Sequence, residues 1–452
     1  MQENVSYIPK RLPVYGHFDV VVIGGGTAGA AAAISAAEEG LKTLVLEKNG
    51  SMGGTQTNGF AVPTMFNGIE NNPLTPVDNE INRRLAEMGA YELRPNNDGY
   101  FNPIYMQMVL EQLLVEKGGK ILYFTPVVDV VMDGKKIQYA VIYNNGGLQA
   151  VFAECFIDAS GDAEVCRMSG AELTGGNSAG LNQHVTLRFE VANVDHTRFK
   201  EQCQRFREEG TLFRHFLEEE AKKGNLDPEY ATSCQAFPVL GKPNCLSFNG
   251  PWVGERCENV ADPEIISEKM IAGRKQIYGV FSTYKKYAEG FENAYISAIA
   301  QTLGIRESRR VVAEYTLTVD DIFNHAKFPD GIGASNYHLD AHGEANFSAD
   351  FMAYKPIDPA EHYYEIPFRS LIPKGIDNLL VVGRCAGTDF LAQSTTRIQH
   401  TCRYMGEAAG IACRLAIESK KAFRDVDGRL VRRCMANKGA VILQKEYHTN
   451  PK

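Results

Sequence analysis

The 452-residue chain lacks several patterns that would assign it to a class at once. None of its ten cysteines is spaced as C-x-x-C, which argues against common dithiol, iron–sulfur and zinc sites, so we expect free, buried thiols and no metal. The most apolar stretch, residues 28–37, is far shorter than the roughly 20 residues of a membrane-spanning helix. The first residues show no secretory-signal pattern. We therefore expect a cytoplasmic protein without a membrane partner.

A positive charge excess is also missing. The formal net charge is −8, whereas a nucleic-acid surface needs clustered Lys and Arg to replace counterions. With 44% hydrophobic and 23% charged residues, the composition is that of an ordinary globular protein. The charge and composition predict a compact, multi-lobed protein with no nucleic-acid partner.

A dinucleotide-binding pattern stands near the start of the chain. The Val-rich run 18–23 is followed by a glycine-rich turn, an alanine-rich segment to Glu39 and a second apolar run that ends at Glu47. Gly24, Gly26 and Gly29 fit G-x-G-x-x-G between the expected strand and helix. In such a loop the glycines allow a tight turn, close approach of a pyrophosphate and close helix packing, while the acid binds ribose hydroxyls.

The rest of the chain predicts an α/β fold. A helix over 103–117 and a strand over 120–124 extend the parallel sheet, and three runs between 127 and 156 form an antiparallel meander. A late strand at 378–382 precedes a helix of small residues around 406–415, so an α+β substrate lobe is interleaved with this Rossmann-like domain. The expected limits are an N-terminal arm at 1–17, a dinucleotide-binding domain at 18–170 and 376–420, a substrate or cap domain at 171–375 and a helical extension at 421–452.

Several segments resemble known flavoproteins. Lys48–Gly59 (KNGSMGGTQTNG) resembles the loop that follows the ribose acid in the glutathione-reductase-like FAD-binding superfamily. Phe156–Asp162 and Asn378–Arg384 are similar to the strand ends that pass the cofactor in that superfamily. Together with GIRESRR at 304–310 and GEAAG at 406–410, these segments resemble bacterial FAD-dependent oxidoreductases related to fumarate reductase.

The resemblance implies a set of FAD contacts. The acid that many relatives carry after the late strand is Arg384 here, so no acid is assigned to the ribityl chain. Because no His or Cys occurs between residues 41 and 60, we expect the FAD to be non-covalent. The expected cofactor residues are Gly24, Gly26, Ala28, Gly29, Glu47, Lys48, Gly53, Gly54, Thr55, Val127, Ala159, Gly161, Gly383, Thr401 and Cys402.

Candidate catalytic residues come from two segments. The stretch from Arg397 to Gly410 can be laid on the R-L-G-G-N-A/S stretch of fumarate reductases, with Gln-His in place of Gly-Gly. The match implies that Arg397 is a carboxylate clamp or a cation at the flavin edge, with a structural ion pair as the alternative, and that Thr401 and Cys402 donate backbone N–H groups to the flavin C2 carbonyl. His400 is either an acid or base beside the flavin or a packing residue.

The second segment is 336–342, an expected strand or loop. Alternation would separate Tyr337 from a face that carries His338, Asp340 and His342. These side chains are either catalytic or metal-binding residues or solvated loop residues, and we retain Tyr337 and His342 as catalytic candidates. The arginines of the run 304–310 are expected on one helix with Glu307, as ion pairs or substrate anchors.

The resulting hypothesis is an FAD-dependent oxidoreductase that transfers a hydride between a small organic substrate and flavin N5. A carboxylate is a candidate substrate, and the electron donor or acceptor and homo-oligomer formation stay open. Gly331-Ile332-Gly333 lacks the third glycine of a second dinucleotide site, so another carrier, a second substrate or oxygen must exchange the electrons. Two alternatives are a hydratase, isomerase or lyase with non-redox FAD, and a flavin-bearing protein without catalysis.

Overall fold

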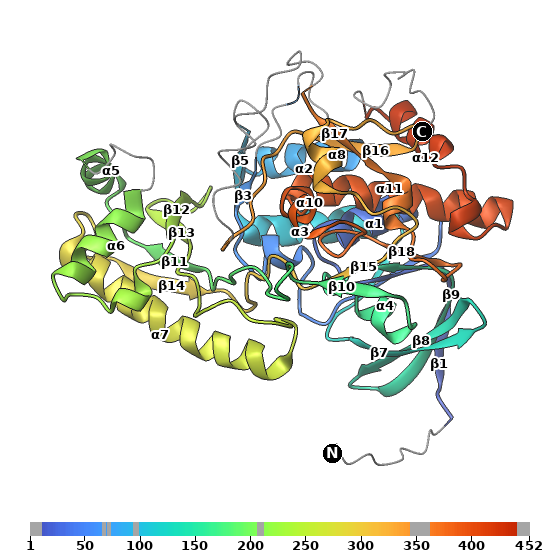
Figure 1. Cartoon of the computed structure of the whole chain (residues 1–452), viewed down its shortest axis with the longest axis horizontal. Helices are drawn as coiled ribbons and strands as arrows, with labels where there is room; N and C mark the ends of the chain where they lie inside the picture. Colours follow the sequence, from blue (N-terminus) through green and yellow to red (C-terminus); the bar gives the residue numbers. More distant parts are fainter. Residues whose placement is uncertain are drawn as a thin grey trace.

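A computed structural model describes residues 11–65, 69, 74–93, 99–205, 212–343 and 362–440 of the chain. Its main feature is a seven-stranded sheet in the order β6-β2-β1-β9-β8-β7, with β18 paired to β9 (Figure 1). The strands are β1 (Val14–Ile23), β2 (Thr43–Leu46), β6 (Lys120–Leu122), β7 (Val127–Asp133), β8 (Lys136–Asn144), β9 (Gly147–Asp158) and β18 (Leu379–Val381).

The sheet has a parallel half and an antiparallel half. Strands β6, β2, β1, β9 and β18 run parallel to their neighbours, as the βαβ pattern and the late strand predict. Strands β7, β8 and β9 form the predicted meander, and β9 then continues into the parallel half. The α/β prediction is confirmed. Strand β1 begins at Val14, so the last four residues of the expected N-terminal arm belong to the sheet.

Two buried helices cover the parallel half and pack closely against each other. They are α1 (Thr27–Glu38) and α11 (Gln399–Ser419), which appear blue and red in Figure 1. A side chain at Gly406 would overlap the Ala28 carbonyl, and a Cβ at Gly410 would lie 2.6 Å from the Ala36 nitrogen. The GEAAG segment is thus explained by close helix packing. Helices α2 (Pro76–Glu87), α3 (Pro103–Glu116) and α12 (Gly428–Asn437) pack around this pair.

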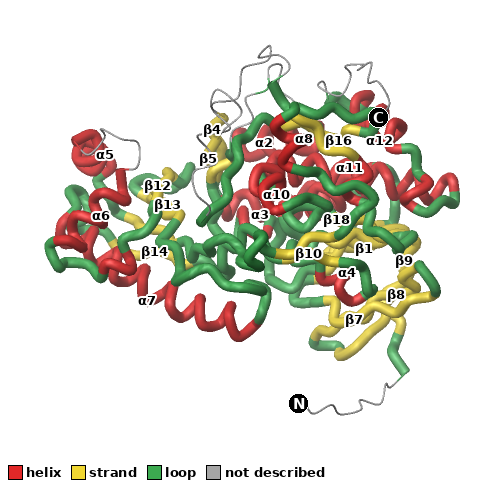
Figure 2. Tube along the Cα trace, in the orientation of Figure 1, coloured by secondary structure: helices red, strands yellow, loops and turns green. Residues whose placement is uncertain are grey.

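A second lobe has its own sheet and core. Its strands follow the order β12-β13-β11-β14, and Figures 1 and 2 show the lobe on the left of the molecule. Its elements are β11 (Phe189–Ala192), β12 (Gln235–Pro238), β13 (Cys245–Asn249), β14 (Tyr295–Ile299), α5 (His196–Arg205), α6 (Leu212–Lys222) and α7 (Pro263–Tyr287). The rings of Phe189 and Phe248 stack with centroids 4.8 Å apart inside this core. We call this lobe the cap.

The hydrophobic cores favour a shorter cap than the expected range 171–375. The cap core uses residues between Val185 and Leu303, whereas residues from Leu317 to Leu339 and from Tyr363 to Ile372 contribute to the core that contains α1 and α11. We therefore propose a cap near 185–303. The elements outside the cap that complete the body are β3 (Pro63–Thr64), β4 (Tyr91–Leu93), β5 (Gly99–Phe101), α4 (Glu164–Met168), β10 (Leu173–Gly175), β15 (Arg309–Val311), α8 (Val319–Phe323), β16 (Gly331–Ser335), β17 (Tyr364–Pro367) and α10 (Phe390–Thr396).

One expected helix is wrong. Residues 304–308 form no helix, and Arg309 and Arg310 lie in β15, which pairs antiparallel with β10. The predicted C-terminal helix is present as α12, while residues 441–452 lie outside the described part. Within the described ranges, no helix is long and apolar enough to cross a membrane.

Candidate FAD and substrate site

The predicted cofactor residues meet at the carboxyl ends of parallel strands. Gly24 follows β1, Glu47 follows β2, Ala159 follows β9 and Gly383 lies just beyond β18. Gly24 has φ +95°, and a Cβ there would lie 2.6 Å from the Ala159 carbonyl oxygen. This edge is where open α/β sheets bind their ligands.

Gly26 and the start of α1 form a cradle for a phosphate group. A Cβ added at Gly26 would meet no atom within 4 Å, whereas one at Gly29 would overlap the Gly24 carbonyl. Gly26 is the N-cap of α1 and supplies no capping side chain, so the first N–H groups of the helix are available to an anion. The open space at Gly26 and the dense packing at Gly29 match the different tasks of these two glycines in a dinucleotide loop.

The loop after β2 packs directly on this cradle. The Gly53 N–H donates to the Gly25 carbonyl at 2.7 Å, and a Cβ at Gly54 would lie 2.9 Å from the Gly26 Cα. Thr55 follows in the same turn. The buried Glu47 carboxylate accepts the Gly25 N–H at 2.7 Å, so the acid lies beside the glycine loop. Gly53, Gly54 and Glu47 therefore lie against the glycine loop.

The remaining cofactor candidates lie around the same edge. A Cβ at Gly383 would touch the Ala28 Cβ at 3.2 Å, which places Ala28 and the turn after β18 together. Lys48 is exposed, and its charge helps to hold the pKa of the buried Asp162 below its usual value despite burial. Val127 begins β7, two residues after Thr125, whose N–H donates to the Glu47 carbonyl at 2.9 Å.

The sequence did not single out Asp162 as a partner of Arg384. Arg384 donates to the Gly161 carbonyl at 2.7 Å and to the Asp162 carboxylate at 2.8 Å. A Gly-Arg after the late strand and an acid after the β9 turn therefore form a buried ion pair. The sequence did contain a signal for this pair. Residue 384 is an arginine where many relatives carry an acid, and an acid, Asp162, stands in the turn after β9.

The start of α11 corrects one predicted contact. The Cys402 N–H donates to the Ile398 carbonyl at 3.0 Å, so it closes the first turn of the helix and is not available to a flavin carbonyl. The backbone N–H of Thr401 comes before the first intrahelical hydrogen bond, so it stays a candidate donor to the flavin. The reason is that α11 begins at Gln399, so the N-terminal donors are Gln399, His400 and Thr401.

The comparisons with known proteins identify the family. A family model described as FAD dependent oxidoreductase matches residues 19–435, which is most of the chain. The chain belongs to the FAD-dependent oxidoreductase family. It is 30% identical over 189 residues to digeranylgeranylglycerophospholipid reductase 2 of Methanothermobacter thermautotrophicus, covering 39% of this chain and 48% of that protein.

Other similarities are shorter or more distant. Dihydrolipoyl dehydrogenase of Trypanosoma brucei brucei is 50% identical over 55 residues, which cover 12% of each chain. The chain thus spans less than half the length of either of these two curated relatives. A geranylgeranyl bacteriochlorophyll reductase-like structure from Thermoplasma acidophilum covers 94% of this chain and 83% of its own, with 16% identity and a TM-score of 0.44.

The members of this FAD-dependent family need a substrate site, and Asp340 organises the best candidate. The Asp340 carboxylate lies 3.0 Å from His342 Nε2 and 3.0 Å from Arg397 Nη2. Tyr337 is buried and hydrogen-bonded to the same carboxylate. Three of the four catalytic candidates therefore meet at one residue. The structure shows a loop here, so Tyr337 and Asp340 do not lie on the opposite faces that alternation predicted.

The environment fixes the protonation of this cluster. Burial and the neighbouring Arg306 lower the pKa of His342 to about 4 despite the opposing effect of Asp340, so its imidazole is neutral at neutral pH. Burial and Asp340 raise the pKa of Tyr337, so the phenol keeps its proton. Burial opposes ionisation of Asp340, but the hydrogen bond from His342 and the charge of Arg397 hold its pKa well below the usual value. The cluster thus offers a neutral base next to a protonated phenol.

His400 does not join the Asp340 cluster. Its side chain is fully buried, and Nδ1 lies 2.6 Å from the carboxylate of Asp78 on α2. Arg403, also buried, pairs with the same carboxylate. Burial would raise the pKa of Asp78, but His400 and Arg403 hold it well below the usual value. Of the two roles that the sequence left open for His400, this environment favours packing in a polar network between α2 and α11.

Proposed function

We propose that the protein transfers a hydride between a carbon of a small organic substrate and the N5 atom of bound FAD. The Asp340 cluster is the observation that carries this proposal, because it combines a neutral base, a protonated phenol and a carboxylate that orients both. The open cradle at Gly26, with Glu47 beside it, fits the dinucleotide.

The chain supplies the proton chemistry, while FAD supplies a reversible hydride acceptor. If the Nε2–H of His342 donates to Asp340, the lone pair on Nδ1 can accept a proton from a substrate hydroxyl, amine or activated C–H group. The Tyr337 phenol can donate a hydrogen bond to the substrate atom that gains negative charge. In the reverse direction the same groups return the proton. With FAD bound, the start of α11 would favour negative charge on the reduced ring.

The proposed relationship to fumarate reductases is supported by one position. Arg397 ends α10 and lies directly before α11, as the carboxylate-binding arginine of the resemblance would. Here Arg397 donates to the carbonyl and the carboxylate of Asp340 at 2.8 and 3.0 Å. Arg397 therefore behaves as an ion-pair partner that orients Asp340, which favours a substrate other than that of fumarate reductases.

The first test is the visible absorption spectrum of the purified protein, repeated after denaturation and filtration. We expect two flavin bands that pass into the filtrate, because non-covalent FAD is released when the fold is lost. An anaerobic screen of alcohols, amines, sugars and activated alkenes then identifies compounds that bleach the oxidised flavin or restore the reduced one. A protein that stays colourless after incubation with FAD would contradict the cofactor assignment, and turnover without any change of flavin colour would contradict hydride transfer.

A further inference from the structure

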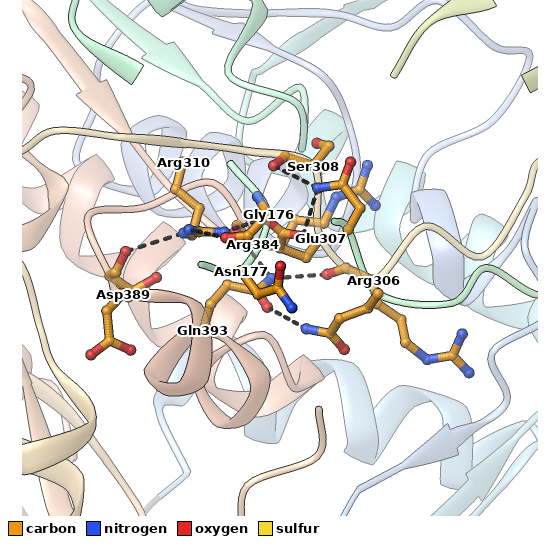
Figure 3. A network of polar contacts seen from close by, with 12 residues as sticks. Gly176, Asn177, Arg306, Glu307, Ser308, Arg310, Arg384, Asp389 and Gln393 are labelled. Atoms are coloured by element: carbon orange, nitrogen blue, oxygen red, sulfur yellow. Dashed lines mark hydrogen bonds and ion pairs between the residues drawn. The ribbon is translucent and has the colours of Figure 1, made fainter. Parts of the chain in front are cut away.

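The three arginines of the run 304–310 have different surroundings. Arg309 pairs with Glu164 at 2.6 Å, and Arg310 pairs with Glu307. Arg306, in contrast, forms no ion pair with a carboxylate of the described residues, and its Nη1 donates to the His184 carbonyl at 2.6 Å. Figure 3 shows the Arg306 side chain directed away from the network around Glu307 and Arg310. Arg306 is therefore the arginine of this run without its own counter-charge.

A second buried arginine comes from the cap. Arg188 lies directly before β11, and its Nη1 donates to the Phe60 carbonyl at 3.0 Å. Phe60 follows the loop of Gly53–Thr55, so Arg188 connects the cap to the segment that lies beside the cofactor cradle. Within the part of the chain that the structure describes, no carboxylate pairs with Arg188, although only 7% of the residue is exposed.

The two segments that carry these arginines are paired by backbone hydrogen bonds: the Gly304 N–H donates to the Thr186 carbonyl at 2.7 Å, and the Ala300 N–H donates to the Arg188 carbonyl at 2.9 Å. Burial and the charge of Arg306 lower the pKa of Arg188 to about 9. Burial and the charge of Arg397 lower the pKa of Arg306 to about 9, against a smaller opposing effect of Asp340. Asp340 is already bound by Arg397 and His342. Buried charges without a counter-charge are unfavourable, so the presence of two such arginines favours a role in binding an anion.

We propose that Arg188 and Arg306 together bind a carboxylate group of the substrate, between the cap and the FAD-binding body. A carboxylate fits because a guanidinium presents parallel N–H donors that match its two oxygens. In this proposal Arg188 and Arg306 bind the carboxylate instead of Arg397, since Arg397 already binds Asp340. The inference rests on the proposed function, because it names the substrate class of the same site.

The experiment uses the FAD-loaded full chain and small carboxylates as probes. Acetate, succinate and benzoate are titrated while the flavin spectrum and the melting temperature are followed, with acetamide, succinamide and benzamide as neutral counterparts and inorganic phosphate as another anion. We expect at least one carboxylate to bind more tightly than its amide and than phosphate. Its Kd should rise at least about tenfold in Arg188→Gln and Arg306→Gln. Arg309→Gln, whose arginine is paired with Glu164, is the matched control and should stay within about twofold.

The melting temperature provides a second readout, because the difference between Arg306→Met and the wild type should change sign when a carboxylate is added. Without carboxylate, Arg306→Met should melt at the same temperature as the wild type or higher, because it removes an unpaired buried charge. With saturating carboxylate the wild type should melt higher, since only its site is filled. Melting of Arg306→Met below the wild type under both conditions would show an internal counter-charge and overturn the inference.

The remaining outcomes separate this inference from the proposed function. Absence of FAD, or turnover without flavin reduction, contradicts the proposed function itself. Normal FAD binding and flavin reduction, together with carboxylate affinities that do not depend on Arg188 and Arg306, contradict only the carboxylate site. Tighter binding of phosphate than of every carboxylate would also overturn the substrate class proposed here.

Discussion

Two buried polar clusters lie on either side of the start of α11, and they differ in how their charges are balanced. Asp78, His400 and Arg403 form a closed set in which one carboxylate serves two basic partners that are themselves fully buried. In the second cluster Asp340 serves Arg397 and His342 but leaves Arg306 without an ion pair among the described residues. In the first cluster the carboxylate of Asp78 pairs with every basic member, whereas the second cluster needs an additional negative charge to pair with Arg306.

The difference indicates which polar residues hold the fold and which serve the chemistry. A closed buried network fixes the register of the elements that it joins, and losing one member exposes the others to an apolar environment. An incomplete cluster lowers stability in exchange for a ligand site. Variants in the closed cluster should therefore act mainly on folding, and variants in the incomplete cluster mainly on turnover.

The largest effect is expected from Asp78→Asn in the closed cluster. The change leaves Arg403 buried without its counter-charge, so the free energy of unfolding should fall by about 3–5 kcal/mol. Urea unfolding at neutral pH measures it. Arg83→Gln on the same helix, which removes an exposed pair with Glu80, should cause no resolvable change. Equal losses in the two variants would contradict the distinction between closed and exposed pairs.

Removing both members of the pair sharpens this test. The double variant Asp78→Asn/Arg403→Met has no uncompensated guanidinium, so it should lose less stability than Asp78→Asn alone. The same urea measurement applies. A double variant that is less stable than the single one would show that Arg403 stabilises α11 by contacts other than its charge.

A pH-dependent effect of about 3 kcal/mol is expected from Glu407, which lies one turn beyond the closed cluster on α11. Burial raises its pKa from 4.5 to about 7, although its carboxyl group accepts the Val77 N–H at 3.1 Å. Because the folded pKa is the higher one, the proton on Glu407 stabilises the fold fully below pH 4.5. This contribution is lost as the pH rises from 4.5 through 7.

The measurement is the free energy of unfolding across that pH range. Glu407→Gln should remove the loss seen in the wild type, so the variant should be relatively more stable at pH 8 than at pH 4.5. The exposed Glu418→Gln on the same helix serves as the control. Identical pH profiles for wild type and Glu407→Gln would contradict the buried, protonated state.

In the incomplete cluster, His342→Gln should reduce the rate constant of flavin reduction at least about a hundredfold. A glutamine side chain can still reach Asp340, so we expect a change of about 1 kcal/mol or less in unfolding free energy. Anaerobic stopped-flow absorbance with a substrate found in the screen measures the rate. Because the pKa of His342 is about 4, the wild-type rate should not change with pH above about 5 through this group. His215→Gln on the cap is the control, and a similar loss there would contradict a specific role.

The sequence predicted the binding edge of the fold better than the substrate side. Gly24, Gly29 and Glu47 could be placed because each has a steric or hydrogen-bonding task set by its position relative to one strand. The same reasoning located the meander and the late strand. Local patterns were sufficient there, since each residue acts on its neighbours in the βαβ unit.

The substrate side depends on contacts between distant segments. Asp78 and His400 are far apart in the chain, and no periodicity connects them. The run 304–310 has helical spacing of its arginines, yet each takes a different direction because the surrounding body supplies different partners. Arg188 gave no motif at all. Its place at the cap boundary follows from tertiary packing, which a single sequence does not encode locally.

The smallest effect is expected at Cys402, which lies on α11 between His400 and Arg403. Burial raises the pKa of its thiol to about 12, so the side chain stays uncharged, and its N–H is already bound to Ile398. Cys402→Ala should therefore leave the flavin spectrum and the FAD affinity within about twofold of the wild type, with a loss of about 1 kcal/mol from the vacated volume. Equilibrium titration with FAD and urea unfolding measure both quantities. A shifted flavin spectrum would mean that this thiol contacts the ring. The reacting site would then extend one turn further along α11 than the comparison of the two clusters indicates.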